Sequence, residues 1–260
     1  MTAYDKLPGL NYSTLKLALT SPRAYARRGY QRDRKALRFG SAFHCVVFEP
    51  ARFATEYAIN PHNGSTKAGK AFTADALAAG KTLVSEADYD VMFECGRALH
   101  EHPECRAQLE SVFATEQAIT ATIEGHLCKG RVDAFSETRT LLGLKTCASL
   151  RSFEWDATRL VYPMQWALYD SILIANGEPA ERVVELVVEK NEPFDCACYV
   201  VTDAVLELGR SQYRRAMRIV DECTARNTWP GMHPGETLLV LPDRAYDQPH
   251  PDDEEVFDDE

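Results

Sequence analysis

The sequence predicts a mixed α/β fold of the α+β kind, in which a helical N-terminal region precedes a mixed sheet. Two observations carry this prediction. Residues 116–146 divide into three short strand-like segments joined by tight turns, which is typical of an antiparallel meander. A long helical stretch at 153–176 and a β-branched run at 182–189 follow, so the order is strand, strand, strand, helix, strand.

The N-terminal region is expected to be mainly helical. Its first helix begins near Asn11 or Ser13, either of which can cap it, and ends near Pro22. A basic stretch with six Arg and one Lys against one acid comes next. In chain order, the expected segments are a short helix, the basic stretch, a buried helix, a polar loop and an amphipathic helix (10–17, 23–38, 41–48, 60–66 and 85–110).

The remaining elements follow from alternation, turns and helical periodicity. Gly125-His126 supplies a tight turn between the first two strands, and Arg139 lies near the turn before the third. An edge strand and a second long helix with apolar residues at helical spacing complete the chain. The strands are expected at 116–123, 127–135, 141–146, 182–189 and 196–201, and the helices at 153–176 and 205–226.

Length and charge favour one domain with an acidic tail. The 260 residues suffice for a single domain over 1–247, and 248–260 carries seven acids with no Lys or Arg. The net charge of −10 includes this tail, so it does not exclude DNA binding by a locally basic channel. No long apolar run or leader-like N-terminus is visible, and a cytoplasmic location is therefore expected, with no membrane contact.

The eight cysteines form no framework that indicates a zinc site. None of them makes a C-x-x-C pair, so all eight are expected to be reduced and structural. They are Cys45, Cys95, Cys105, Cys128, Cys147, Cys196, Cys198 and Cys223.

Two neighbouring strands carry residues suited to phosphodiester hydrolysis. This reaction needs an activated water and stabilisation of charge on the phosphoryl oxygens, which carboxylate-bound divalent metals and a lysine provide. In a strand, residues two apart share a face, so an acid-x-Lys pair aims both groups at one point. Asp133 lies late in the second predicted strand and Lys145 lies on the third, but Gly143 occupies the acid position of the acid-x-Lys pair.

The chain resembles the exonuclease VIII (RecE) branch of the PD-(D/E)XK nuclease superfamily. The resemblance rests on the joint order of several short motifs along most of the chain, each of which is weak alone. The matching pieces are Ser13-Thr14-Leu15-Lys16 with Ser21-Pro22, Phe39-Gly40-Ser41-Ala42-Phe43-His44, Glu116, Gly130-Arg131-Val132-Asp133, Leu144-Lys145-Thr146, Gln165 with Tyr169, Trp229-Pro230-Gly231 and Leu241-Pro242.

The resemblance implies a restriction-endonuclease-like core and roles for individual residues. Asp133 and His44 would bind Mg²⁺, for which Mn²⁺ could substitute, and Glu116 would be an auxiliary acid. Lys145 would orient the attacking water and offset charge on the scissile phosphate. Gln165 and Tyr169 lie four apart on one helical face and would hold the water, the lysine or the DNA. Phosphate contacts are expected from Ser13, Lys16 and Arg131.

The implied activity is 5′-to-3′ degradation of one strand from double-stranded DNA ends in phage-type recombination. The resemblance also implies a single-strand annealing partner of the RecT type and a ring-shaped homo-oligomer. Gly143 lacks the carboxylate of the family, and the nearest other acids considered are Glu124 and Glu137. A disabled nuclease that cuts little DNA and gains activity from Gly143→Asp is therefore expected. The alternative is a non-catalytic protein that binds DNA ends or regulates others.

Overall fold

The structure is a computed structural model that describes residues 3–28 and 35–240. The predicted acidic tail at 248–260 lies outside the described residues, as does the middle of the basic stretch, 29–34. The division into one domain and a tail therefore stays a prediction. None of the helices in the described part of the chain combines the length and apolar character needed to cross a bilayer.

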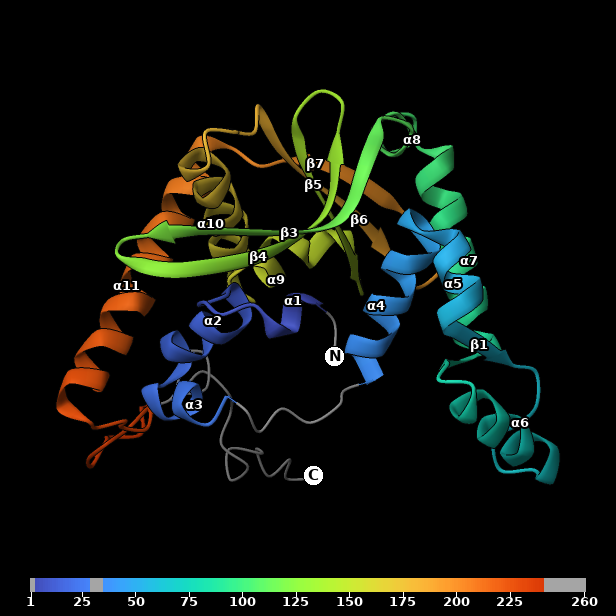
Figure 1. Cartoon of the computed structure of the whole chain (residues 1–260), viewed down its shortest axis with the longest axis horizontal. Coiled ribbons are helices and arrows are strands. Elements are labelled where there is room, and N and C mark those ends of the chain that lie inside the picture. Colours follow the sequence, from blue (N-terminus) through green and yellow to red (C-terminus); the bar gives the residue numbers. More distant parts are fainter. Residues whose placement is uncertain (1–2, 29–34, 241–260) are drawn as a thin grey trace, which may run out of the picture.

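A five-stranded mixed sheet forms the centre of the molecule (Figure 1). The first three strands are antiparallel, as predicted, the fourth runs parallel to the third, and the fifth is an antiparallel edge strand. In spatial order they are β3 (Val112–Ile123), β4 (His126–Ser136), β5 (Thr140–Cys147), β6 (Arg182–Glu189) and β7 (Cys196–Val200).

Helices cover both faces of this sheet. One layer consists of α2 (Tyr12–Thr20), α10 (Tyr162–Ala175) and α11 (Asp203–Arg226), and the other is built mainly from α4 (Lys35–Phe48) and α7 (Glu86–Glu101). The crossover between the parallel strands β5 and β6 contains α10, as such strands require. The shorter helices are α1 (Ala3–Lys6), α3 (Pro22–Ala26), α5 (Pro50–Glu56), α6 (Lys67–Ala78), α8 (Pro103–Glu110) and α9 (Phe153–Arg159), with one 3-10 turn at Leu150–Ser152.

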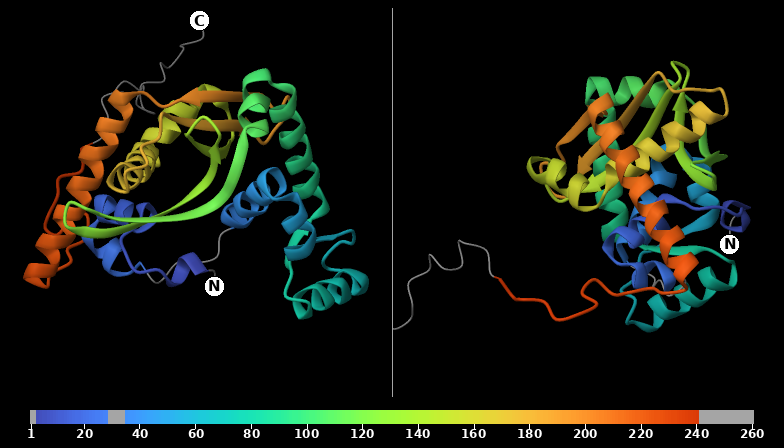
Figure 2. Two further views of the ribbon diagram at one scale, coloured as in Figure 1. Left: turned by 45° about the horizontal axis from the view of Figure 1, so that its top comes forward. Right: turned by 90° about the vertical axis from the view of Figure 1, so that its left-hand side faces the viewer.

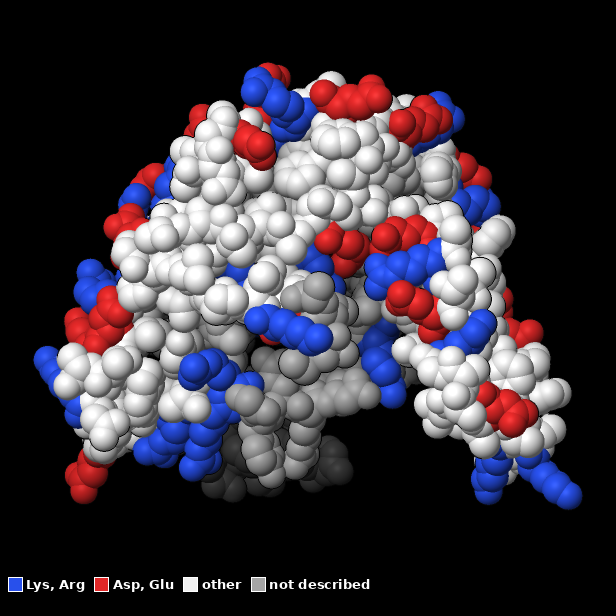
Figure 3. Space-filling view, viewed as in Figure 1, with Lys and Arg blue, Asp and Glu red and all other residues white. Residues whose placement is uncertain are grey.

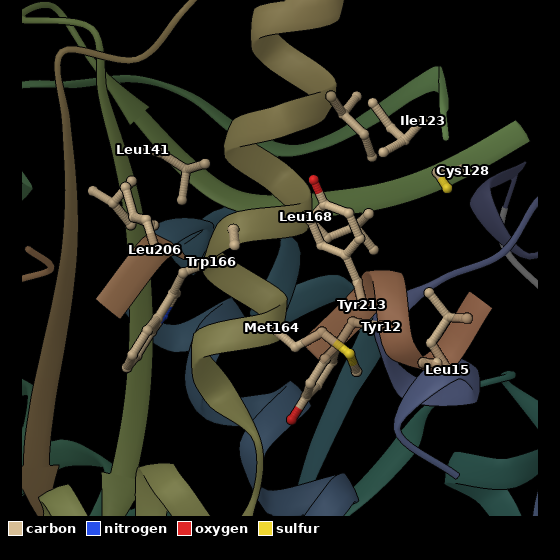
Figure 4. Close-up of a cluster of buried hydrophobic side chains, with 14 of the residues drawn as sticks. Tyr12, Leu15, Ile123, Cys128, Leu141, Met164, Trp166, Leu168, Leu206 and Tyr213 are labelled. Carbon is tan, nitrogen blue, oxygen red and sulfur yellow. The ribbon is translucent and has the colours of Figure 1, made fainter. Parts of the chain in front are cut away.

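The two layers bury separate apolar cores. Successive residues of a strand point to opposite faces, so β5 and β6 contribute to both cores in alternation. Leu141, Val183 and Val187 belong to the core that includes α10 and α11, together with Met164, Leu168, Leu206 and Tyr213. Figure 4 shows Leu141 close to Leu206, with Met164 and Tyr213 farther along α10. The second core contains Leu142, Leu144, Val184, Leu186 and Val188 together with α4 and α7.

Burial on both faces explains the nearly continuous apolar run of β6. Within this run Glu185 is the exception, since it is an acid at 1% exposure between buried valine and leucine residues.

A second, two-stranded parallel sheet was not predicted. It consists of β1 (Tyr57–Asn60) and β2 (Thr82–Ser85), with α6 between them in the chain, where only a polar loop was expected. Together β1, β2 and α6 form a limb at one end of the molecule, while α2, α3 and the end of α11 form a limb at the other (Figures 1 and 2).

Two predicted helices are each divided in the structure. The helix expected at 153–176 breaks between α9 and α10, because Val161 adopts a left-handed conformation at φ 63° and Pro163 lies in the first turn of the next helix. The helix expected at 85–110 breaks at His102, which precedes Pro103. The eight cysteines are all free, as predicted.

Candidate metal centre

Four polar side chains predicted from the sequence converge from four separate elements. They are His44 of α4, Glu116 of β3, Asp133 of β4 and Lys145 of β5. One ligand atom each from His44, Glu116 and Asp133 lies within 4.8 Å of the others. Lys145 Nζ lies 3.7 Å from Asp133 Oδ2. The structure therefore brings the predicted metal ligands and the predicted lysine to one place.

β4 and β5 separate near these four side chains. The two strands pair only at Ala134↔Leu142 and Phe135↔Leu141. Beyond these pairs, the Leu144 N–H donates to the side chain of Asp133, at 3.1 Å from its Oδ2, in place of a backbone carbonyl of β4. The Asp133 carboxylate thus joins the two strands and satisfies a backbone donor that the separation would leave unpaired.

Glu116 reaches the cluster through an irregular strand. Gln117 pairs with Val132 on β4, and Thr115 pairs with Ala134, which places Glu116 across from Asp133. Glu116 itself has φ 51°, an uncommon conformation for a residue other than glycine.

The Glu116 side chain is held by a neighbour and is largely buried. Arg131 Nε lies 2.9 Å from Glu116 Oε2. Burial raises the pKa of the Glu116 carboxyl, although Arg131 opposes this rise. Arg131, predicted to contact phosphate, therefore lies beside the metal cluster as the partner of Glu116.

The orientation of His44 leaves one ring nitrogen facing Asp133. Its Nε2 donates to the Leu144 carbonyl oxygen at 2.8 Å, because a carbonyl can only accept. Its Nδ1 lies 3.5 Å from Asp133 Oδ1. A histidine that binds a metal through one nitrogen usually donates from the other to such an acceptor.

The groups around His44 determine the pKa of its imidazole when no cation is bound. Burial lowers the pKa of the imidazole, but the facing Asp133 carboxylate outweighs burial, and the pKa is raised overall.

Electrostatics keep Asp133 ionised and Lys145 charged. Burial alone would raise the pKa of the Asp133 carboxyl, but His44, Lys145 and the Leu144 N–H hold it well below its usual range. For Lys145, burial opposes the charge, yet the Glu185 and Asp133 carboxylates raise its pKa well above the ordinary value. An anionic Asp133 is a ready ligand for a cation.

The donor set fits a divalent metal that accepts both nitrogen and oxygen. An imidazole nitrogen and two carboxylates suit Mn²⁺ and related ions, and Mg²⁺ can be held by the carboxylates with water completing its shell. Within the described residues, this is the only group of three or more His, Cys, Asp or Glu side chains close enough to hold an ion.

Gln165 and Tyr169 lie together on α10, as their spacing predicted. Gln165 Nε2 donates to the Tyr169 hydroxyl at 3.4 Å. The Tyr169 ring covers Gly130, where an added Cβ would lie 2.6 Å from ring atom Cε1. Gly130 therefore allows α10 to pack closely on β4 near Asp133. Burial in this contact raises the pKa of the Tyr169 hydroxyl.

The predicted phosphate contacts Ser13 and Lys16 lie on α2, outside the metal cluster. Ser13 is exposed, and its hydroxyl donates to Asn11 Oδ1 at 2.9 Å. Lys16 Nζ lies 4.8 Å from the ring centroid of Tyr12. The Tyr12 hydroxyl in turn donates to the Leu160 carbonyl at 2.6 Å, just before α10.

Neither of the two alternative acids considered from the sequence joins the cluster. Glu124 follows β3 and accepts from Arg214 of α11 at 2.9 Å. Glu137 follows β4, is exposed, and its backbone N–H donates to the Ser111 carbonyl. Neither lies among the ligand atoms grouped around Asp133.

Glu185 is the acid that sequence reasoning missed. It pairs directly with Gly143 across the parallel strands β5 and β6. Its Oε1 accepts from Lys145 Nζ at 3.1 Å, and its Oε2 accepts from the Trp166 indole. Burial raises the pKa of the Glu185 carboxyl, and the Lys145 ammonium opposes that rise. The sequence did contain one signal for this residue, since Glu185 is the single acid inside the apolar run of β6.

Comparisons with known proteins agree with this fold. The model of the family described as "PDDEXK-like domain of unknown function (DUF3799)" matches residues 12–237. The structure is similar to the crystal structure of a candidate exonuclease of Eubacterium rectale, with a TM-score of 0.62 and 16% identity over 95% of this chain and 97% of that one. At this identity the similarity concerns the fold alone.

Two further comparisons add little. The structure of SSO0001 aligns at a TM-score of 0.29 and 16% identity, over 78% of this chain and 84% of that one, which is too low to indicate a common fold. No curated protein matches the chain in sequence. With the mixed sheet and its helical layers, the family match confirms the predicted PD-(D/E)XK class of fold.

Proposed function

We propose that this chain, which belongs to the family of PDDEXK-like domains whose model matches residues 12–237, is a metal-dependent deoxyribonuclease. One observation carries this proposal. His44, Glu116 and Asp133 converge from three elements beside the charged Lys145. A purely structural cluster would not need an imidazole nitrogen and two carboxylates directed at one point.

The cluster supports hydrolysis of a phosphodiester. His44, Asp133 and Glu116 would hold Mg²⁺ or Mn²⁺, which when bound polarises a phosphoryl oxygen and acidifies a water molecule. Lys145 is held by carboxylates with its ammonium 3.7 Å from Asp133, where it can offset charge on the scissile phosphate. Gln165 and Tyr169 provide an amide and a hydroxyl on the adjacent helix that can orient water or substrate.

Duplex DNA ends are the proposed substrate. Lys and Arg side chains gather at the free ends of both limbs (Figure 3). Exposed Arg23, Arg27 and Arg28 belong to the limb of α3, and exposed Lys67 and Lys70 to that of α6. Basic groups on two sides of an acidic metal centre can guide a phosphate backbone toward it.

The finer proposals rest on resemblance to the RecE branch. They are 5′-to-3′ degradation of one strand, a role in phage-type recombination, an annealing partner of the RecT type, and a ring-shaped homo-oligomer. The similar Eubacterium rectale protein is itself named as a candidate exonuclease. Gly143 favours the alternative, a non-catalytic protein that binds DNA ends.

Digestion of end-labelled duplexes tests the proposal. With Mg²⁺ or Mn²⁺, the full chain should shorten a linear duplex, release a 5′ label before a 3′ label, and leave a covalently closed circle intact. Chelation of the metal should stop the reaction, because the cluster cannot supply the charge of the missing cation. If the linear duplex stays intact with both metals, the proposed nuclease activity is refuted. Binding to DNA ends, measured in the same samples, would then favour the non-catalytic end-binding protein. Cleavage of the closed circle would refute the requirement for ends.

A further inference from the structure

We infer that Glu185 on β6 supplies the carboxylate that Gly143 on β5 lacks, so that the acid of the acid-x-Lys pair has moved to the neighbouring strand. This inference rests on the proposed function, because it assigns a further residue to the same site. In the described geometry Glu185 touches Lys145 directly, which makes it a positioning residue for that lysine and a source of negative charge beside the metal ligands.

The register of the two parallel strands supports this exchange. Gly143 pairs with Glu185, and Lys145 pairs with Val187. A Cβ built on Gly143 would lie 2.5 Å from Glu185 Oε1 and 2.6 Å from Oε2. Real Cβ atoms essentially never lie this close to a neighbouring atom. The Glu185 carboxylate therefore fills space that a side chain at position 143 would need.

The surroundings of Glu185 are those of a carboxylate held in place. The residue is 1% exposed, yet both oxygens have donors, Lys145 Nζ and the Trp166 indole N–H. Burying such a group is costly unless it is paired and hydrogen-bonded, and an apolar residue would suit the rest of β6. Asp133 is also close enough for its charge to affect Glu185.

Glu185 and a side chain at position 143 would compete for the same space between β5 and β6. Here a Cβ at position 143 would lie less than 3 Å from the Glu185 carboxylate, so an acid at 143 would force that carboxylate to shift from its contacts with Lys145 and Trp166. The loss of activity expected from the sequence, and its gain from Gly143→Asp, are therefore reversed: the chain as it stands has its acid, and a second one beside it should harm the site.

A reciprocal exchange tests the inference. Glu185→Gln, which keeps the shape and removes the charge, should lower the initial rate of duplex digestion at least about 10-fold with little change in KM. It should also weaken Mn²⁺ binding measured by calorimetry. Gly143→Asp alone should lower the rate as well. Gly143→Asp combined with Glu185→Ala should recover most of the rate and the Mn²⁺ affinity, because the acid returns to β5 and the space for it is free.

Asp170→Asn provides a matched control. Asp170 is a buried acid on α10 whose Oδ2 accepts from Arg210 at 2.9 Å, away from the metal ligands. Its loss should lower thermal stability without changing Mn²⁺ affinity. If Glu185→Ala alone unfolds the chain, the isosteric Glu185→Gln decides, with folding checked by circular dichroism.

Three outcomes would overturn the inference. They are wild-type rate and Mn²⁺ affinity in Glu185→Gln, a gain from Gly143→Asp with Glu185 in place, and a folded double variant that remains as impaired as Glu185→Gln. If the unaltered chain digests no DNA, the proposed function fails instead. In that case the Mn²⁺ affinities of the unaltered chain and of Glu185→Gln still decide whether Glu185 contributes to the metal centre.

Discussion

Replacing Asp133 by asparagine is expected to abolish metal-dependent cleavage, with a loss of about 1,000-fold or more in rate, equivalent to several kcal/mol of transition-state stabilisation. Asp133 is the residue that contacts His44, Lys145 and the Leu144 N–H at once. Asparagine keeps an oxygen that can accept from the Leu144 N–H, so the joint between β4 and β5 is preserved while the negative charge is lost. The measurement is the initial rate of duplex digestion.

Thermal unfolding separates lost binding from lost folding in Asp133→Asn. Mn²⁺ should raise the melting temperature of the unaltered chain, because a ligand that binds only the folded state stabilises it. It should leave the melting temperature of Asp133→Asn unchanged. Glu124→Gln is the control, since Glu124 pairs with Arg214 outside the cluster. If Asp133→Asn digests DNA at the rate of the control, Asp133 is not a ligand of the catalytic metal.

Replacing Lys145 by methionine is expected to cost about 3–5 kcal/mol of unfolding free energy at neutral pH, as for other buried ion pairs that lose one partner. Glu185 is almost fully buried, and Lys145 is the cation that pairs with it. Methionine fills a similar volume but leaves this carboxylate unpaired. The double variant Lys145→Met with Glu185→Gln should lose less stability than Lys145→Met alone. Urea denaturation of the metal-free proteins measures both.

The pH dependence of the Lys145→Met variant follows from the state of Glu185. Burial raises the pKa of the Glu185 carboxyl and Lys145 opposes that rise, so removal of the lysine should raise this pKa further. As the pH falls, Glu185 takes up a proton and no longer needs a cation, so the stability difference from the unaltered chain should shrink. A difference that grows toward acid pH, or a variant that digests DNA at the normal rate, would contradict the role given to Lys145.

Local sequence patterns predicted the central part of the fold and most of the candidate site. Alternation and turns placed the meander, so Asp133 and Lys145 could be assigned to neighbouring strands of one sheet. His44 is distant in sequence, and its place came from resemblance alone. Its contact with Asp133 depends on how α4 packs against β5, which no local pattern specifies.

The features that were missed depend on contacts between distant segments. Glu185 faces Gly143 because a crossover containing α10 fixes the register of two parallel strands, and periodicity within β6 gives no sign of it. The limb of β1 and β2 is built from strands of four residues each, too short to show alternation. The break at Val161 reflects a left-handed residue that helical periodicity does not exclude.

Anomalous scattering from a crystal grown with Mn²⁺ tests the metal centre most directly. The expected result is an anomalous difference peak within coordination distance of Asp133 and Glu116 carboxylate oxygens and of His44 Nδ1, with the His44 Nε2–H still bonded to the Leu144 carbonyl. Clear density for these side chains without a peak between them, or Mn²⁺ bound only elsewhere on the molecule, would contradict the proposal that this cluster is the catalytic centre of a nuclease.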